Sequence, residues 1–551
     1  MAGVELPKYF SNRIVTHEQA LEATVTNGTS LVTGFATSEP IAVYERLWDH
    51  IQKHDLRDIT IRQALFMAPH RLLVGDALAA GGLLRGIVEG TKTPSLIGAL
   101  ARRANEITKK VEGLSKLIDH FRELQERRIV FVSGFMGAAS NMIIPKNAMT
   151  RLLYPEFVGR NKSRMGIVDM QSVHFPDATG GMAFRHDGTP TFNLIAAAVT
   201  PPNAQGEMSL GIANGATWET MTFALEKPSI NIVLYMNAKY PFTYGYGDAS
   251  NTFHYSQFRR AANEGRLFVV EDETRLPSLP AGSFDNPAAV EMKIAENVVN
   301  HIEMHPEDTH GRAIQVGFGG TGVLAIKLLA NSAWTGRSYT EMMEPFTWDL
   351  WEAGKIAGSH FVERDGSRTQ LDGKLVFTFS IGVDGDGFYE KMHNNRDVIC
   401  APSSRVVIPE AFYGGLGINN CLSIDFQGHL NSAGRDKNHY SGIGGAAMIN
   451  RGLIVGGIAY LCMKSTHRTP EGKLRSSVFP FQPVGTPLSL IGPDFFGTRD
   501  GAKVFLATEH GVAQVNAQPQ SDFIRSIISV ADPDFRGWLK QRAWEEFRVS
   551  V

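Results

Sequence analysis

The sequence predicts an α/β protein made of two open α/β domains, and three observations support this fold class. Short apolar runs rich in β-branched residues alternate with longer segments of helical periodicity. The alternation stops at a stretch rich in Gly, Pro and Ser, at residues 276–286. Beyond that stretch the same alternation begins again. We therefore expect an N-terminal α/β domain over residues 1–260 and a C-terminal α/β domain over residues 285–551.

In the first part of the chain, four apolar runs are expected to form strands. They are TSLVTGFA (29–36), RRIVFVSGF (127–135), TFNLIAAAV (191–199) and INIVLYMN (230–237). Helical periodicity marks THEQALEAT (16–24) and the charged segment 102–128, whose apolar residues recur at helical spacing. We interpret the charged segment as an amphipathic helix with a solvated face.

The second part of the chain repeats this pattern. Its expected strands are AIQVGFG (313–319), KLVFTFSIG (374–382), LIVGGIAYLC (453–462) and AKVFLATEHG (502–511). Its clearest helical segment is NPAAVEMKIAENVVNHIEM (286–304). The same rhythm of strands and helices predicts α/β layers in this part as well.

Composition and charge narrow the range of functions. The chain has 551 residues, of which 43% are hydrophobic and 20% charged, and its formal net charge is -2. This balance gives no electrostatic reason to expect nucleic acid or an anionic membrane surface as a partner. The start of the sequence lacks a secretory signal, no apolar run is long enough to span a membrane, and the three cysteines have no C-x-x-C spacing. We expect a soluble protein of the reducing cytosol that acts on small molecules, with neither a metal site nor a disulfide framework.

A glycine-rich loop lies between an apolar strand and an apolar helical pattern. Gly317, Gly319 and Gly322 have the G-x-G-x-x-G spacing, in which glycines let a backbone approach a phosphate and the helix start offers free amides. Glu341 lies about 20 residues further on, where a dinucleotide-binding fold has its ribose-binding acid. An NAD-dependent oxidoreductase is therefore an alternative, although residues 330–341 contain no apolar run for the strand that would carry Glu341. A glycine turn without any ligand is a further alternative.

Glu341 also has a purely local explanation. Ser338 and Glu341 have the spacing of a capping box, in which a serine N-cap is followed by a glutamate at the third helical position. On this interpretation Glu344 is a first-turn acid that interacts favourably with the helix dipole. Only the wider context distinguishes such a cap from a reactive carboxylate.

That context is a series of motifs in a fixed order. The glycine loop is followed by TEM (340–342), DLWEAGKIAGS (349–359), INNCLSIDFQGHLNSAGRD (418–436), SGIGGAAMINRG (441–452), ATEHGVAQVNA (507–517) and SVADPDFRGWL (529–539). Two earlier turns, PPNAQGEMSLG (201–211) and MNAKYPFTYG (236–245), belong to the same series. Together these segments resemble the acetyl-CoA hydrolase/transferase family of class I CoA-transferases. The resemblance extends from about residue 190 onward and is weak over residues 60–190.

The resemblance implies a covalent mechanism with Glu341 as the nucleophile. The carboxylate attacks the thioester of an acyl-CoA, which gives an acyl-glutamyl anhydride and free CoA thiolate. The thiolate then attacks the glutamyl carbonyl, so that the first acid leaves and an enzyme glutamyl-CoA thioester remains. A second carboxylate reverses these steps and leaves as a new acyl-CoA. Such a covalent intermediate divides one difficult acyl exchange into easier steps.

The resemblance also implies roles for other residues. Gly445 corresponds to the family's oxyanion glycine, and Glu509 to an active-site glutamate that orients the carboxylate substrate or manages protons. Coenzyme A, a co-substrate and not a permanently bound cofactor, is expected to lie against the CoA-binding positions Gly317, Phe318, Gly319, Gly320 and Gly444. The implied partners are an acyl-CoA, a carboxylic acid and a second copy of the chain, in a homodimer or larger assembly. The active site is expected in the cleft between the two domains.

Some family positions hold other residues in this chain. Tyr339 stands for the histidine before the TE sequence, and Ser404 or Arg405 stands where relatives have an asparagine that helps the oxyanion site. A lysine of relatives is absent near TPEGK (469–473), with Arg405 or Arg468 as candidate substitutes. These changes leave Glu341 in place and leave the acyl group open. They also leave open a hydrolase on the same scaffold, in which water attacks the glutamyl thioester.

Overall fold

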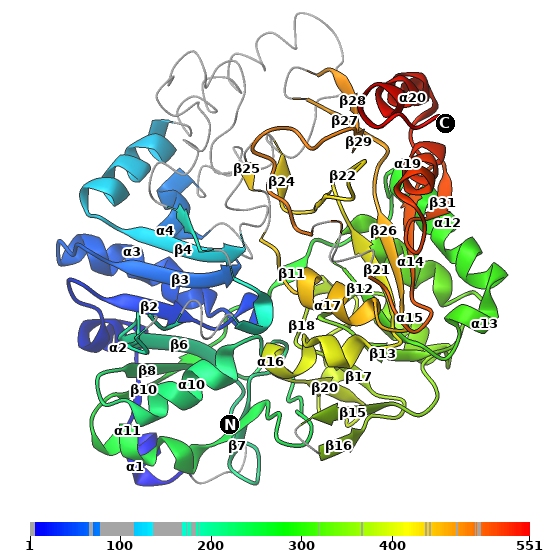
Figure 1. Ribbon diagram of the computed structural model, residues 1–551. Helices are drawn as coiled ribbons and strands as arrows, with labels where there is room; N and C mark the ends of the chain where they lie inside the picture. Colours follow the sequence, from blue (N-terminus) through cyan, green and yellow to red (C-terminus); the bar gives the residue numbers. More distant parts are fainter. Residues whose placement is uncertain are drawn as a thin grey trace, which may run out of the picture.

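A computed structural model describes most of the chain. The described residues are 6–65, 70–77, 115–135, 168–171, 173–177, 183–185, 187–317, 319–364, 367–435, 438–439, 442–469, 472–490, 492 and 497–551. Two large sheets lie side by side, the N-terminal one at the left of Figure 1 and the C-terminal one at the right. None of the helices within the described ranges combines the length and the apolar character needed to cross a membrane.

The N-terminal sheet has, among the described residues, eight strands that all run parallel in the order β1-β10-β8-β6-β2-β3-β4-β5. Their bounds are β1 (Ile14–Val15), β2 (Ser30–Thr33), β3 (Thr60–Leu65), β4 (Val130–Phe135), β5 (Val168–Met170), β6 (Leu194–Val199), β8 (Asn231–Asn237) and β10 (Leu267–Asp272). One face is covered by α2 (His17–Thr24), α3 (Ile41–Lys53) and the helical residues 115–126, and the other by α1 (Lys8–Ser11), α10 (Thr217–Glu226) and α11 (Arg259–Asn263). Helices on both faces explain why all six residues of β6 are buried.

The C-terminal sheet also has eight strands among the described residues, in the order β20-β17-β13-β12-β21-β26-β30-β31. They are β12 (Ala313–Val316), β13 (Arg337–Tyr339), β17 (Leu375–Phe377), β20 (Val398–Cys400), β21 (Leu416–Asn420), β26 (Ile458–Cys462), β30 (Lys503–Thr508) and β31 (Gly511–Gln514). All described pairings are parallel except that of β30 with β31. The covering helices are α12 (Ala289–Met304), α14 (Gly320–Leu329), α17 (Ala446–Leu453), α19 (Gln520–Ser529) and α20 (Pro533–Phe547).

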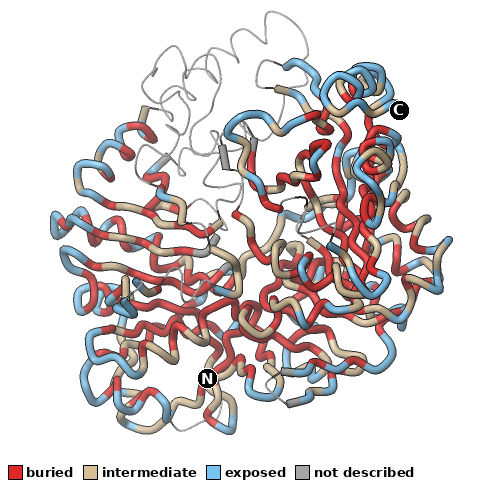
Figure 2. Tube along the Cα trace, in the orientation of Figure 1, coloured by how far each residue is buried: buried red, intermediate tan, exposed pale blue. Residues whose placement is uncertain are grey.

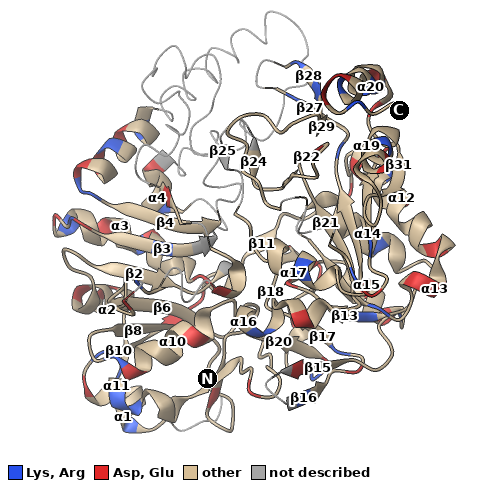
Figure 3. Ribbon diagram, viewed as in Figure 1, with Lys and Arg blue, Asp and Glu red and all other residues tan. Residues whose placement is uncertain are grey.

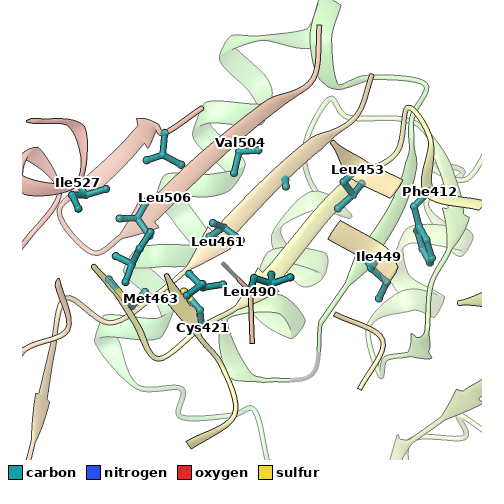
Figure 4. Packing of buried hydrophobic residues seen from close by; sticks show 14 of the residues in the cluster. Phe412, Cys421, Ile449, Leu453, Leu461, Met463, Leu490, Val504, Leu506 and Ile527 are labelled. Atoms are coloured by element: carbon teal, nitrogen blue, oxygen red, sulfur yellow. The ribbon is translucent and has the colours of Figure 1, made fainter. Parts of the chain in front are cut away.

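The strands of the C-terminal sheet feed two apolar clusters, because successive residues of a strand point to opposite faces. In β26, Ile458 and Tyr460 pack with α12 and α14, whereas Ala459 and Leu461 pack with α17 and α19. Figure 4 shows the second of these clusters, with Leu461 and Ile527 among its members. Buried segments follow the strands in both halves of the molecule (Figure 2).

Several short helices and small sheets of two or three strands lie outside the two large sheets. They are α4 (Arg71–Val74), α13 (Pro306–Thr309), α15 (Thr347–Glu352), α16 (Ser403–Val406), β7 (Glu207–Ser209) paired with β9 (Thr252–His254), β14 (Met342–Met343) with β18 (Phe379–Ser380), β15 (Phe361–Arg364) with β16 (Ser367–Gln370), β22 (Ser423–Asp425) with β23 (Leu430–Asn431) and β29 (Val478–Phe479), β24 (Gly434–Arg435) with β25 (Asn438–His439), and β27 (Thr466–Arg468) with β28 (Leu474–Ser476).

Each apolar run that the sequence assigned to a strand contains an observed strand, and both helical segments outside the charged stretch are helices. The charged segment is helical over residues 115–126, and its apolar residues Leu117, Ile118, Phe121 and Leu124 are buried. The remainder of that segment, residues 102–114, lies outside the described residues.

A strand of the N-terminal sheet lies beyond residue 260, where the N-terminal domain was expected to end. β10 ends at Asp272 and belongs to the N-terminal sheet, whereas the next strand, β11 (Ser278–Leu279), pairs with β19 (Gly382–Val383) in the C-terminal half. We therefore propose that the N-terminal domain continues to Asp272 instead of ending at residue 260.

The two halves are joined by segments that follow strands of both sheets. Oγ1 of Thr37 donates to the carbonyl oxygen of Ser380 at 2.9 Å, and the amide of Asn214 donates to that of Thr378 at 2.8 Å. Parallel sheets bind ligands beyond the carboxyl ends of their strands. The joining segments therefore enclose the region in which a site is expected.

Candidate active site

Glu341 follows the carboxyl end of β13, a strand that the sequence did not predict. β13 pairs in parallel with β12 and β17, and the amide of Thr378 donates to the carbonyl oxygen of Glu341 at 3.1 Å. The predicted capping box is wrong, because Ser338 lies within a strand and Glu341 directly precedes another, β14. The capping-box pattern is local, whereas the partners of β13 lie distant in sequence, and their pairing determines the conformation.

Glu341 is partly accessible as a residue, but the Oε2 atom of its carboxyl group is buried. Burial raises the pKa of its carboxyl group to about 7, and a hydrogen-bonding interaction with the Gly445 backbone acts in the opposite direction. Oε2 is buried and has no hydrogen bond of normal geometry among the described residues. A Cβ on Gly445 would overlap Oε2, and one on Gly444 would lie 3.6 Å from Oε1. Both glycines therefore lie directly against the carboxyl group.

The turn that carries these glycines also contacts the N-terminal half. The amide of Phe175 donates to the carbonyl oxygen of Gly444 at 3.0 Å, and a Cβ on Gly444 would lie 3.2 Å from the ring of Phe135 at the end of β4. Gly444 has a φ of 57°, which favours glycine. Gly445 caps α17, so the free amides at the start of that helix are next to Glu341. Glu341 thus lies where the two halves and a helix N-terminus meet.

The glycine loop lies between β12 and α14, as predicted. Gly319 has a φ of 140°, and a Cβ there would collide with Asn420 at the end of β21. β12 and β21 are the neighbours at which the strand order reverses, a point where open α/β sheets bind ligands. Of the predicted CoA-binding residues, Phe318 lies outside the described part of the chain.

A cleft of about 820 Å³ opens beside this loop. Its lining includes Gly319 and Gly320, and it receives Lys464, Arg468 and Glu291 from other elements. Gly317, Gly444, Gly445 and Glu341 are not among the described residues that line it. The predicted residues therefore form two separate sets. One set is the Glu341 carboxyl group with the Gly444–Gly445 turn, and Glu341 follows strand β13. The other set is the glycine loop, which follows the neighbouring strand β12 and borders the cleft.

The expectation that no strand carries Glu341 is wrong, and in this respect the arrangement agrees with a dinucleotide site. Glu341 does follow a second strand parallel to the first, and residues 337–339 form that strand without an apolar run. The carboxyl group nevertheless lies against Gly445, outside the lining of the loop cleft. The side chain is thus placed for contact with the α17 turn.

The cations of the cleft include one that the sequence did not single out. Lys464 follows β26 and lines the cleft together with Arg468, which the sequence offered as a substitute for a missing lysine. The other candidate, Arg405, is ion-paired with Asp248 at 2.8 Å, and Ser404 is hydrogen-bonded to Glu219. No sequence pattern marks Lys464, because it reaches the loop only through the pairing of β26 with β21.

Glu509 contacts the segment that lines the cleft. Its carboxylate accepts hydrogen bonds from the hydroxyl of Ser465 at 2.6 Å and from the Ser465 amide at 3.0 Å. Ser465 lies beside Lys464 in the segment that lines the cleft. These contacts anchor that segment, and no contact between Glu509 and Glu341 is found among the described residues. The predicted role of Glu509 toward the carboxylate substrate stays a prediction.

Glu344 is completely buried, and neither carboxyl oxygen has a hydrogen-bond partner among the described residues. Burial alone raises its pKa well above the ordinary value, because the charged form is poorly solvated inside the protein. The predicted first-turn role is wrong, because α15 begins only at Thr347. Glu344 is instead an acid enclosed inside the protein, where burial favours its protonated form.

Replacing Glu344 by glutamine is expected to stabilise the protein increasingly as the pH rises. The folded-state pKa lies above the unfolded one, so the stabilising contribution of the proton is complete below the unfolded pKa and is lost as the pH rises through the folded pKa. Glutamine stays neutral throughout. Thermal unfolding of both proteins between about pH 5 and pH 9 tests this, with a Tm difference that grows with pH. A difference independent of pH would contradict the burial of a protonated acid.

Residues 385–543 match the family model of the acetyl-CoA hydrolase/transferase C-terminal domain, so the resemblance seen in the motifs is confirmed. The chain is 25% identical to 4-hydroxybutyrate coenzyme A transferase of Clostridium kluyveri, over 63% of this chain and 72% of that protein. It is 28% identical to succinyl-CoA:cyclohexane-1-carboxylate CoA transferase of Geobacter metallireducens, over 46% and 54%. It is 23% identical to butyryl-CoA:acetate CoA-transferase of Anaerostipes caccae, over 45% and 52%. The chain thus spans about half the length of two of these relatives.

Solved structures share the fold along nearly the whole chain. RipA from Yersinia pestis has a TM-score of 0.67 and 20% identity, covering 98% of this chain and 99% of its own. 4-Hydroxybutyrate CoA-transferase from Porphyromonas gingivalis has a TM-score of 0.60 and 17% identity, with coverages of 98% and 99%. The α/β fold class predicted from the sequence is therefore confirmed.

Proposed function

We propose that this chain is an acyl-CoA:carboxylate CoA-transferase in which Glu341 forms a glutamyl-CoA thioester. The observation that carries the proposal is the placement of Glu341, whose carboxyl group lies against the Gly444–Gly445 turn at the junction of the two halves. The names of the relatives describe CoA transfer between thioesters and carboxylic acids, which supports the same chemical class here.

The first step is attack by a Glu341 oxygen on the thioester carbonyl carbon, which forms the mixed anhydride and releases CoA thiolate. With a pKa of about 7, the carboxyl group is ionised in a large fraction of molecules at neutral pH. A carboxylate with few hydrogen bonds has little solvation to lose as it attacks. The residue is thus suited to act as a nucleophile.

Negative charge develops on the carbonyl oxygen in this step. Backbone amides at a glycine turn and at a helix start are donors that require no rearrangement to stabilise such charge. We assign this role to the turn at Gly445, which caps α17 beside Glu341. The thiolate then attacks the glutamyl carbonyl carbon, the C–O bond of the anhydride breaks, and the first carboxylate leaves.

The loop cleft is assigned to the nucleotide part of coenzyme A. Gly319 and Gly320 lie at the start of α14, and Lys464 and Arg468 supply positive charge beside them. Phosphates bind at such helix starts and to such cations. These residues do not define the acyl group or the acceptor acid, so several acyl-CoA donors are compared.

The proposal is tested by intact-protein mass spectrometry after brief incubation with acetyl-CoA, butyryl-CoA, succinyl-CoA or 4-hydroxybutyryl-CoA, without an acceptor acid. We expect at least one donor to add the mass of CoA less water to the native protein and none to add it to the Glu341→Ala variant. The donor that reacts also identifies the acyl class. Addition of a free carboxylic acid should remove the adduct.

Three other outcomes are informative. Release of CoA without an adduct or an acceptor would favour the hydrolase alternative, in which water attacks the thioester. An adduct that persists in Glu341→Ala would assign the nucleophile elsewhere. If no donor reacts or releases CoA, the transferase proposal is wrong, and stabilisation against heat by NAD but not by CoA would then favour the oxidoreductase alternative.

A further inference from the structure

The start of α14 in the wall of the glycine-loop cleft is in contact with a carboxylate. The N-cap residue is Gly319, and no described side chain caps the helix. A Cβ on Gly320 would collide with Oε2 of Glu291, a residue of α12, so this carboxylate lies directly against the first turn. The first amides of a helix lack intrahelical partners and attract anions. Glu291 therefore occupies a position suited to an anionic group of a ligand.

Glu291 is also paired with a cation across the cleft. Nζ of Lys464 lies 2.6 Å from Oε1 of Glu291, and the two side chains are 47% and 27% exposed. Such a partly exposed ion pair contributes little to stability and is readily exchanged for another. The backbone beside Lys464 is anchored through Ser465 to Glu509, so exchange needs only side-chain rotation.

The charges of the cleft favour a phosphate over a carboxylate. Among the described residues of its lining, Glu291 is the one acid, whereas Lys464 and Arg468 are basic. The hairpin of β27 and β28 borders the cleft, and Figure 3 marks the basic residues on it, which are Arg468 on β27 and Arg475 on β28. A phosphate that enters the cleft is attracted by the cations and repelled by Glu291 until that carboxylate moves away.

We propose that Glu291 is an internal competitor for the phosphate-binding position of the cleft. A phosphate of CoA displaces its carboxylate from the start of α14 and replaces it as the counter-ion of Lys464. This inference rests on the proposed function, because it takes CoA to be the ligand of the cleft. Lys464 and the start of α14 have an anionic neighbour both before and after the exchange. An incoming ligand must therefore bind them more strongly than the Glu291 carboxylate does. Glu291 thus selects for ligands whose negative charge exceeds that of a single carboxylate.

The experiment is calorimetric titration of free CoA and of pantetheine, which lacks phosphate, into the native protein and the variants Glu291→Gln, Lys464→Gln and the double variant. We expect Glu291→Gln to lower the Kd for CoA about threefold to fivefold, the size expected for one partly exposed charge. Its Kd for pantetheine should not change. Lys464→Gln should weaken CoA binding, and adding Glu291→Gln to it should restore part of the loss, because the unpaired carboxylate then no longer repels the phosphate.

Glu296→Gln is the matched control. Glu296 lies on the same helix and is paired with Lys293 at 3.3 Å, and its side chain is 44% exposed. It should leave the Kd for CoA unchanged. An unchanged or raised Kd for CoA in Glu291→Gln, with the Glu341 adduct still forming, would overturn this inference alone. Failure of the native protein to bind CoA at all would overturn the inference and the proposed function together.

Discussion

Replacing Glu341 by glutamine is expected to reduce turnover by at least about 10⁴-fold, the scale of loss seen when a covalent nucleophile is removed. Glutamine has nearly the same shape as glutamate, so the contacts of the side chain with Gly444 and Gly445 are retained. Its amide oxygen is a much poorer nucleophile than a carboxylate, and the mixed anhydride does not form. The loss is therefore expected in the chemical step and not in CoA binding.

The same substitution is expected to stabilise the folded protein above neutral pH. The pKa of Glu341 is about 7 in the folded state against 4.5 ordinarily, so the stabilising effect of its proton is complete below about pH 4.5 and is lost as the pH rises through about 7. Glutamine is neutral at every pH. After a discount for the accessible part of the residue, the gain at pH 8 is about 2 kcal/mol in the free energy of unfolding.

Turnover with the donor that forms the adduct, CoA titration and urea unfolding at pH 5 and pH 8 measure these effects together. Glu344→Gln is the matched control, since it makes the same chemical change three residues away at a buried position, and it should retain turnover. Loss of activity together with loss of stability would instead assign Glu341 to the fold. Turnover within tenfold of the native rate would exclude Glu341 as the nucleophile.

The sequence was most informative where local and long-range preferences agree. The run LIAAAV of β6 is apolar throughout, and it forms a strand that helices cover on both faces. β13 consists of Arg337, Ser338 and Tyr339, which have no apolar alternation, and it forms because β12 and β17 flank it on both sides. The capping-box pattern at the same residues therefore predicted a helix where none exists. A strand of three residues that forms only because of its neighbouring strands cannot be predicted from the local sequence pattern.

The candidate site divides in the same way. Motifs identified Glu341 and Gly445, and the structure brings these two together. The burial of Glu344 and the pairing of Glu291 with Lys464 carry no sequence signal, because each depends on the packing of separate elements. The spacing of residues along the chain indicates which side chains follow the end of a strand. The ion-pair partner and the solvation of a side chain depend instead on which other elements the fold packs against it.

The second large effect is expected for Gly445→Ala. A methyl group on Gly445 would overlap Oε2 of Glu341 and also collide with Val407. The φ of Gly445 is -88°, which alanine adopts without strain, so the effect arises from contact with the carboxyl group and not from the backbone. We expect turnover to fall by about 10²- to 10³-fold, as when a donor to the developing oxyanion is lost. Stability should fall by about 1–3 kcal/mol, because the contact is overpacked.

Gly537→Ala separates this effect from a general response to glycine replacement. Gly537 lies in α20, and a Cβ there would meet nothing within 4 Å, so activity should be unchanged and stability slightly increased. Adduct formation by mass spectrometry and CoA titration complete the measurement for Gly445→Ala. CoA should still bind to the loop cleft, which Gly445 does not line, while the glutamyl adduct forms slowly or not at all. Native rates of adduct formation in Gly445→Ala would mean that Glu341 reacts in a different orientation and that the α17 turn does not stabilise the oxyanion.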